Sequence, residues 1–184
     1  MSTLKTNTIQ AATGTIVNVA AGHTFAPPGH VIQTKSMTLT SSTTASSNSY
    51  TDSGLTLSIT PSATSSKILI TGFVNLGCDY FKNYMKVLRD GSDLVVGDAA
   101  GTREQVFSSS HPGDTNWDSY AISAVPINLL DSPNTTSSVN YKVQFKSYRG
   151  TSGTATVNRC YSDRENSGFD ERTVSVLTLQ EIAA

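Results

Sequence analysis

Histidine, the residue that most often performs acid–base or metal chemistry, occurs in this chain as His23, His30 and His111. His23 and His30 flank Pro27-Pro28 at a separation of seven residues, which is not a recognised spacing for metal ligands. We interpret both as solvated loop residues. The alternative is a site in which three copies of one histidine meet on a threefold axis. His111 lies near serines and an aspartate, but adjacency in sequence is not the geometry of a hydrolase triad.

Two acidic pairs provide the other candidate catalytic groups. Asp163/Glu165 and Asp170/Glu171 have the residue types of the glycosidase carboxylates. Each pair adjoins an arginine, Arg164 or Arg172, so we favour a solvated cluster of ion pairs. The chain has no Gly-rich phosphate loop, no Gly-x-Ser-x-Gly elbow and no His-Glu-x-x-His motif. The sequence therefore predicts a non-enzymatic protein without a metal or a cofactor.

Aromatic residues in expected loops point to recognition instead. Tyrosine, tryptophan and phenylalanine offer large contact areas at low entropic cost, and they stack on sugars. Arginine and amide side chains beside them add directional hydrogen bonds. The alternative is that Trp117 and Phe81 cap the ends of the fold, and for Trp117 we favour that interpretation. The candidate receptor-binding residues are Asp79, Tyr80, Arg159, Tyr161, Asp163, Arg164, Asn166 and Trp117, with Phe169 as a further loop aromatic.

The composition of the 184 residues favours strands and excludes several kinds of protein. Serine and threonine number 26 and 25, whereas charged residues make up 15% and there are only four glutamates. A net charge of −1 argues against nucleic acid as the main ligand. We find no apolar stretch long enough for membrane insertion and no signal peptide at the start, so we expect synthesis in a host cytoplasm.

Apolar residues alternate with period two through most of the chain, as in half-buried strands. Asp90-Gly91 between two apolar runs predicts a tight hairpin turn, and Pro126 indicates an edge strand or a bulge. About ten antiparallel strands predict an all-β jelly-roll sandwich. The expected strands are 31–39, 55–59, 67–76, 82–89, 93–97, 103–107 (a weak candidate), 119–130, 138–148, 154–158 and 173–182.

The chain divides at Pro27-Pro28-Gly29 into an N-terminal segment, 1–28, and a head domain, 29–184. The segment has too few apolar residues to offset the entropy of ordering its backbone. We therefore expect it to be ordered only against a partner or against sister chains.

Strict alternation of ten strands would place the loops after odd-numbered strands at one end, which we expect to be distal to the N-terminal segment. Cys78 and Cys160 would then lie at the same end, where a disulfide could form. Two free thiols are the favoured interpretation in a reducing cytoplasm. The loops expected at this end are 40–54, 77–81, 98–102, 131–137 and 159–171.

The order of these motifs resembles the C1q/TNF-like head. The resemblance rests on Ser66-Lys67-Ile68-Leu69-Ile70, the Arg89-Asp90-Gly91 hairpin, Val139-Asn140-Tyr141-Lys142-Val143 and the closing Gln180-Glu181-Ile182. The opening Ser2-Thr3-Leu4-Lys5-Thr6-Asn7-Thr8-Ile9-Gln10 resembles the start of fibre and structural proteins of tailed marine bacteriophages. The chain departs from C1q-type proteins in lacking a Gly-X-Y collagen stalk.

The resemblance implies a homotrimeric virion fibre or spike whose residues 1–28 attach to other virion proteins. Its head would contact a host-surface glycan or protein. The alternative is a capsid decoration or cement protein whose head binds other virion subunits. A fibre-borne depolymerase would need converging carboxylates, which we do not find, and a secreted lectin would need a signal peptide. Apolar residues on both faces of 173–182 favour trimer contacts at this last strand.

Overall fold

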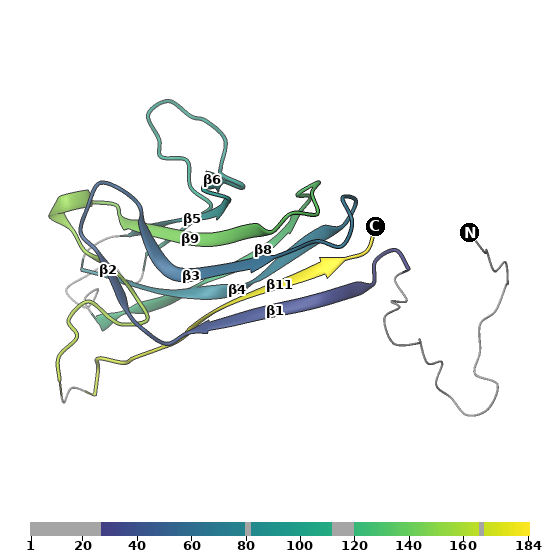
Figure 1. Cartoon of the computed structure of the whole chain (residues 1–184). Coiled ribbons are helices and arrows are strands. Elements are labelled where there is room, and N and C mark those ends of the chain that lie inside the picture. Colours follow the sequence, from purple (N-terminus) through teal and green to yellow (C-terminus); the bar gives the residue numbers. More distant parts are fainter. Residues whose placement is uncertain (1–26, 80–81, 112–119, 166–167) are drawn as a thin grey trace, which may run out of the picture.

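The computed structural model describes residues 27–79, 82–111, 120–165 and 168–184, which form two antiparallel sheets packed face to face (Figure 1). The all-β sandwich predicted from the sequence is confirmed. No helix in the described ranges is long and apolar enough to cross a membrane. The elements are β1 (Val31–Leu39), β2 (Thr43–Ala45), β3 (Thr51–Ile59), β4 (Lys67–Cys78), β5 (Asn83–Arg89), β6 (Ser92–Asp93), β7 (Ser108–Ser110), β8 (Ile122–Asp131), β9 (Val139–Ser147), the 3-10 turn η2 (Gly150–Ser152), β10 (Ala155–Val157) and β11 (Ser175–Ile182).

The first sheet is organised around the long strand β4. One edge of β4 pairs with β8, and the other pairs first with β11 and then with β10. Outside these, β1 pairs with β11 and β2 pairs with β10. Pro126 lies in β8, whose described pairing is with β4 alone, so the edge position that this proline predicted is confirmed.

The second sheet has the order β3-β9-β5, with β6 and β7 both paired to the free edge of β5. Asp90 and Gly91 form the predicted tight turn between β5 and β6. Their φ angles of 49° and 86° are those that such a turn requires.

Alternation in the strands produces the core between the sheets. In β9 every second residue from Val139 to Ser147 is buried, and β11 alternates in the same way from Ser175. The largest fully buried side chains include Tyr141, Phe145 and Leu177. Each buried side chain of this size contributes roughly 1.5–3 kcal/mol of transfer free energy.

The expected strands 93–97 and 103–107 are wrong as two separate strands. Within this stretch only Ser92–Asp93 and Ser108–Ser110 form strands on β5, and residues 94–107 between them form an insert. The amides of Leu94 and Phe107 at its two ends still donate to β5, and the part between them rises above the sheet in Figure 1. The insert is closed by its own hydrogen bond, from the Gly97 amide to the carbonyl of Val106 at 3.1 Å. β6 and β7 thus run along one edge in the same direction, as a single interrupted strand.

Residues 40–54 are not simply the loop that the pattern indicated. They hold β2, which has no apolar alternation and exists through its pairing with β10. They also hold the first part of β3, where polar Ser53 is buried and donates a 2.8 Å hydrogen bond to the Val143 carbonyl. The β3–β9 register shifts between Asp52 and Thr56, around Gly54 with a φ of 97°. The described residues therefore form eleven strands instead of ten.

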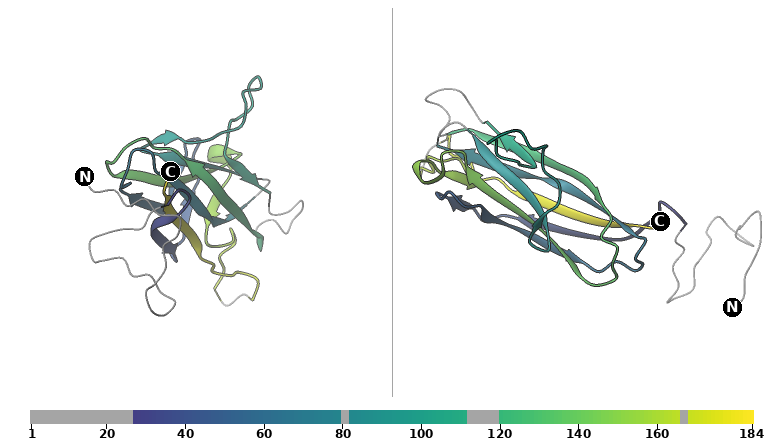
Figure 2. Two further views of the ribbon diagram at one scale, coloured as in Figure 1. Left: turned by 90° about the vertical axis from the view of Figure 1, so that its right-hand side faces the viewer. Right: turned by 90° about the horizontal axis from the view of Figure 1, so that it is seen from above.

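The sandwich has two distinct ends. At the terminal end, Val31 of β1 lies opposite Ile182 of β11, and the Gly29 amide donates to the Ala183 carbonyl at 2.7 Å. We call the opposite end the distal end; in Figure 1 and the right panel of Figure 2 it lies away from the label C. The strands flanking 79–82, 111–121 and 148–154 end there, because Cys78, Ser110 and Ser147 lie at the far ends of their pairings.

This geometry corrects the predicted placement of two loops. Residues 131–137 lie at the terminal end, since Asp131 pairs with Ile68 and Ile68 pairs with Glu181. Residues 98–102 belong to the insert and not to an end of the sandwich. The error for 131–137 arises because β6 and β7 count as one pass of the chain, which reverses the directions expected for β8 and β9. β10 and β11 likewise run in the same direction along one edge of β4, so the loop 158–174 interrupts a single pass.

Both cysteines are buried thiols that form no disulfide, the interpretation favoured from the sequence. Cys78 ends β4 opposite Ala155 of β10. Cys160 lies close by, because a Cβ built on the neighbouring Gly77 would be 3.3 Å from the Cys160 Cα.

Candidate recognition surfaces

The segment 158–174 between β10 and β11 is a long loop with a rigid base. Asn158 has a φ of 61° and is buried, and its amide nitrogen donates to the carbonyls of Leu39 and Ser41 at 2.8 and 2.9 Å. Its amide oxygen accepts a 2.6 Å hydrogen bond from the Ser175 hydroxyl. Arg159 and Arg172 then form an isolated antiparallel bridge. The loop is therefore held at both of its ends.

Three charged residues of this loop pair with one another. The Asp163 carboxylate lies 3.3 Å from the Arg159 guanidinium and 2.6 Å from that of Arg172. Arg159 also donates to the carbonyls of Cys160 and Tyr161 and to the Thr44 hydroxyl in β2. Arg159 thus links the loop to β2, and Asp163 joins the two arginines at the base of the loop.

Arg164 forms a second pair, with Asp170 across the loop. The Arg164 guanidinium donates to both Asp170 oxygens at 3.0 and 3.3 Å, and the Arg164 amide also donates to that carboxylate. These hydrogen bonds hold the pKa of Asp170 well below its usual range. The ion-pair interpretation of the two acidic pairs is confirmed for Asp163 and Asp170, whose carboxylates pair with Arg172 and Arg164.

An exposed aromatic group remains above these ion pairs. The Arg164 guanidinium lies 4.7 Å from the ring centroid of Tyr120, which is 6.5 Å from the Phe169 ring. Phe169 is 70% exposed and Tyr161 is 41% exposed. Of the predicted residues here, Tyr161 and Arg164 are exposed, and Arg164 and Phe169 both lie beside Tyr120.

Asp79 lies at the distal end as predicted, and its hydrogen bond is to the loop before β10. Its amide donates to the Thr154 carbonyl at 3.0 Å, which ties β4 to the loop before β10. Its Oδ1 atom is buried and has no hydrogen-bond partner among the described residues. The remaining candidates, Tyr80, Trp117 and Asn166, lie outside the described residues.

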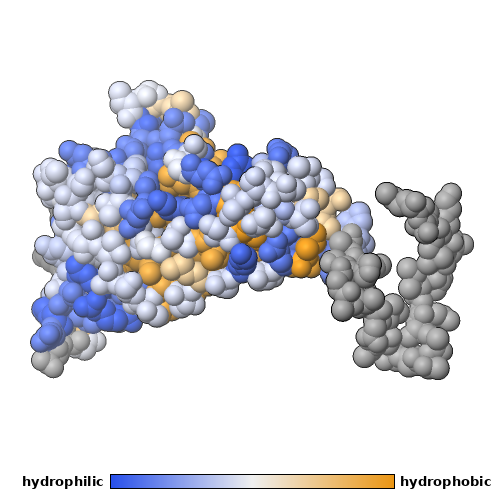
Figure 3. All heavy atoms as spheres, in the orientation of Figure 1, coloured by the Kyte–Doolittle hydropathy of each residue, from blue (hydrophilic) through white to orange (hydrophobic). Residues whose placement is uncertain are grey.

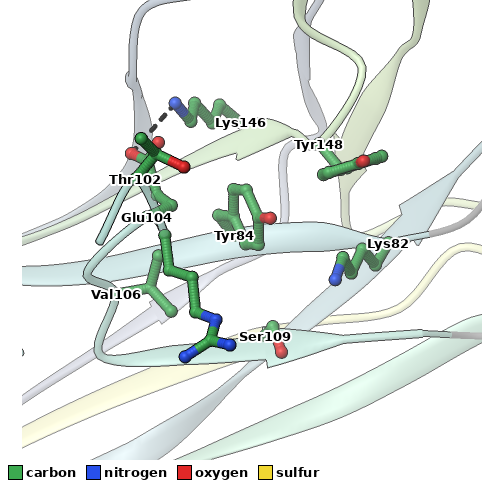
Figure 4. Close-up of a pocket in the computed structure, with 9 residues that line it drawn as sticks. Lys82, Tyr84, Thr102, Glu104, Val106, Ser109, Lys146 and Tyr148 are labelled. Carbon is green, nitrogen blue, oxygen red and sulfur yellow. Dashed lines mark ion pairs between the residues drawn. The ribbon is translucent and has the colours of Figure 1, made fainter. Parts of the chain in front are cut away.

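A groove that the sequence analysis did not identify lies on the outer face of the second sheet. It has a volume of about 600 Å³ and is bounded by β5, β7, β9 and the insert 94–107 (Figure 4). Its lining combines tyrosines with charged side chains from separate parts of the chain. The lining residues are Lys82, Tyr84, Thr102, Arg103, Glu104, Val106, Ser109, Lys146 and Tyr148.

Lysine and tyrosine side chains alternate in a row across this face. The rings of Tyr84 and Tyr148 meet edge to face with centroids 5.9 Å apart. The Lys82 ammonium lies 5.0 Å from the Tyr148 centroid, and that of Lys146 lies 4.8 Å from the Tyr50 centroid. Such contacts hold ammonium groups beside aromatic faces without neutralising their charge.

Glu104 connects the insert to this row of lysine and tyrosine side chains. Its carboxylate accepts a 3.2 Å hydrogen bond from the Tyr50 hydroxyl and pairs with Lys146 at 3.0 Å, the dashed line in Figure 4. Burial and the adjacent Glu104 charge raise the pKa of Tyr50, and burial with neighbouring groups raises that of Tyr84. Both phenols therefore stay protonated at physiological pH and can donate hydrogen bonds.

Within the described residues no group of three or more His, Cys, Asp or Glu side chains is placed to hold a metal ion. His111 directly follows β7 at the distal end, and His30 lies beside the C-terminus, where its carbonyl accepts from the Ala183 amide. His23 lies outside the described residues.

No sequence family and no curated protein matches the chain. Among solved structures, that of infectious bursal disease virus Gx strain aligns with 92% of the chain at 12% identity and a TM-score of 0.38. The VP2 subviral particle of the same virus aligns with 84% at 16% identity and a TM-score of 0.32. The chain spans 42% and 38% of the length of these two structures. Likeness of this degree does not establish a relationship.

Proposed function

We propose that this protein is a non-enzymatic structural component of a virion, the trimeric fibre or spike of a tailed bacteriophage. Residues 1–28 attach it to other virion proteins, and the sandwich head contacts a glycan or protein on the host surface. The N-terminal motif Ser2–Gln10 supports a phage origin through its resemblance to phage fibre proteins.

The observation that carries the proposal is the separation of the two ends of the head. The chain enters the sandwich at Gly29, beside Ala183, and Cys78, Ser110 and Ser147 end their strands at the opposite end. A head held by its N-terminal segment would thus present the described residues of that end outward. Loops on a rigid scaffold can carry recognition residues at little cost to folding.

The aromatic cluster of the 158–174 loop also favours contact with a partner. Arg164 is held by Asp170 against Tyr120, beside Phe169, while Tyr161 is exposed on the same loop. Prepositioned aromatic and arginine side chains are those that dominate binding energy at interfaces.

Assembly as a homotrimer is part of the proposal and draws on the outer face of the first sheet. Val176 pairs with Phe73, and Leu69 pairs with Leu130, which is 58% exposed. These apolar pairs lie on the face turned away from the core. In Figure 3 the visible side of the head is mostly polar, with apolar residues in narrow areas between polar ones. A sister chain on the outer face of this sheet would cover its apolar residues.

Adsorption of particles that carry Tyr161→Ala with Phe169→Ala tests the contact with the host. We expect the double variant to lower the adsorption rate about tenfold, the effect of losing aromatic contacts at a binding surface. Val95→Ala is the matched control, because Val95 is 49% exposed but lies in the insert, away from the 158–174 loop.

Trimer content and incorporation into particles are measured first for both variants. Unchanged adsorption of intact particles would contradict a host-binding role for this loop and favour the decoration protein. Loss of incorporation without loss of folding would indicate that the loop binds other virion subunits.

A further inference from the structure

The groove on the second sheet holds more positive than negative charge. Among its lining residues Lys82, Arg103 and Lys146 are cationic, and Glu104 is the single carboxylate. Glu104 is already paired with Lys146 at 3.0 Å and accepts from the Tyr50 hydroxyl. Lys82 and Arg103 have no carboxylate within 4.0 Å among the described residues. The groove therefore has two cations available to an anionic ligand.

Tyrosine rings beside these cations define the shape that the ligand must have. Tyr148 is 52% exposed and meets Tyr84 edge to face at 5.9 Å, with the Lys82 ammonium 5.0 Å from the Tyr148 centroid (Figure 4). An exposed aromatic face stacks on the C–H face of a sugar ring, and an adjacent ammonium pairs with a carboxylate on that ring. Ser109 and Thr102 add hydroxyl groups that can bond sugar hydroxyls.

Contacts between the insert and the second sheet shape the groove. Glu104 fixes the insert to β9 through Lys146, and the Phe107 amide donates to the Met85 carbonyl of β5 at 3.0 Å. Pre-formed sites of about 300–1,000 Å³ are typical of small-molecule binding, and a volume of about 600 Å³ accommodates a few sugar residues.

We infer that this groove binds an acidic saccharide, with Tyr148 stacking on a sugar ring and Lys82 and Arg103 pairing with its carboxylate. A nucleic acid fits less well, because a phosphate chain needs many cationic contacts and the whole protein carries a net charge of −1. The inference rests on the proposed function and specifies a ligand class for the head, at a site other than the 158–174 loop.

Calorimetric titration of the full-length protein tests the inference directly. The probes are hexagalacturonic acid and an oligosialic acid of six residues, with neutral cellohexaose and a hexathymidine oligonucleotide for comparison. We expect at least one acidic saccharide to bind at least tenfold more tightly than cellohexaose. We also expect its affinity to fall as salt rises from about 50 to about 300 mM, because the Debye length, which is about 10 Å at 0.1 M salt, shortens over this range and charges are screened more strongly.

Variants assign the binding to the groove. Lys82→Met with Arg103→Gln is expected to weaken acidic-saccharide binding at least tenfold, and Tyr148→Ala to weaken it about as much. Lys142→Met is the matched control: this lysine lies on the same face of β9, outside the groove, where it pairs with Asp52 at 2.8 Å. Thermal unfolding of each variant confirms that the head remains folded.

Any one of four results would overturn the inference. These are equal binding of acidic and neutral saccharides, preference for the oligonucleotide, no binding of either acidic probe, and equal affinities of the groove and control variants. These outcomes are separate from failure of the proposed function. If no acidic saccharide binds but the Tyr161/Phe169 variant still impairs adsorption, the groove inference fails and the proposed function stands. If the saccharide binds but no head variant alters adsorption, the groove is a real site and the host-contact role fails.

Discussion

Glu181 is a fully buried carboxylate in the last strand, and its environment keeps it charged. Gln33 donates a hydrogen bond of 2.6 Å to it, and the Ser62 amide and hydroxyl donate bonds of 2.7 and 2.6 Å. Burial by itself would raise the pKa of Glu181, but the hydrogen bonds from Gln33, Ser62 and Ser66 outweigh it and hold the pKa below its ordinary value. The residue ties β11 to β1 and to the loop before β4.

Because the folded-state pKa of Glu181 is lowered, its ionised form stabilises the fold above the unfolded-state value of 4.5. That stabilisation is lost as the pH falls through the folded-state pKa. We expect Glu181→Gln to lower the free energy of unfolding at pH 7 by about 1–3 kcal/mol, because the Gln amide places a donor against other donors. The loss should shrink below pH 4.5.

Denaturant unfolding from pH 7 to pH 3 measures both effects. Glu171→Gln is the control, since Glu171 is exposed in the loop before β11. A Glu181→Gln profile parallel to that of the wild type at all pH values would contradict the account.

At the scale of elements, β4 organises the first sheet because three strands pair with its two edges. The close approach of β4 to β11 depends on Gly72, which has a φ of 152°. Gly72 pairs with Leu177 of β11 on one side and with Ile127 of β8 on the other. A Cβ at position 72 would be 2.0 Å from the Val176 carbonyl oxygen. Backbone atoms of a paired strand cannot move away without breaking the ladder.

We therefore expect Gly72→Ala to destabilise the head by about 3 kcal/mol or more, the range of severe backbone and packing defects. Gly97→Ala is the control, because its nearest atom would be the Val106 carbonyl oxygen at 3.9 Å, and its effect should stay within about 0.5 kcal/mol. Thermal and denaturant unfolding measure both. Equal stability of the two variants would show that β4 and β11 can separate at this point.

For the whole molecule, the outer face of the first sheet decides whether the chain can remain a monomer. Val176 and Ile182 of β11 are half-buried on this face, whereas Leu177 and Leu179 fill the core. Both faces of the last strand thus carry apolar residues, as the sequence predicted.

Light scattering at neutral pH should give a mass about three times the 19.5 kDa of one chain. Val176→Lys should lower the mass toward that of the monomer, because a charge would be buried between sister chains. Thr56→Lys, on the exposed face of β3 in the other sheet, should leave the mass unchanged. A wild-type mass near 19.5 kDa would rule out the homotrimer.

The class of fold, most of the strands and the character of the side chains could be predicted from the amino-acid sequence. Period-two alternation in Val139–Ser147 and the Asp90-Gly91 turn are local signals, and the structure confirms both. Alternation and tight turns succeed because a residue and its near neighbours are enough to specify them. The sequence also predicted that Asp163 and Asp170 would form ion pairs, but their partners are not the adjacent arginines: Asp163 pairs with Arg159 and Arg172, and Asp170 pairs with Arg164 across the loop.

Which distant residues meet depends on the three-dimensional arrangement of the strands. β2 has no pattern of its own and depends on β10, more than a hundred residues later, while the interruption between β6 and β7 moved residues 131–137 to the terminal end. The groove unites Lys82, Arg103 and Tyr148, which are far apart along the chain. Sheet register and strand order arise from long-range pairing, and no local periodicity encodes them.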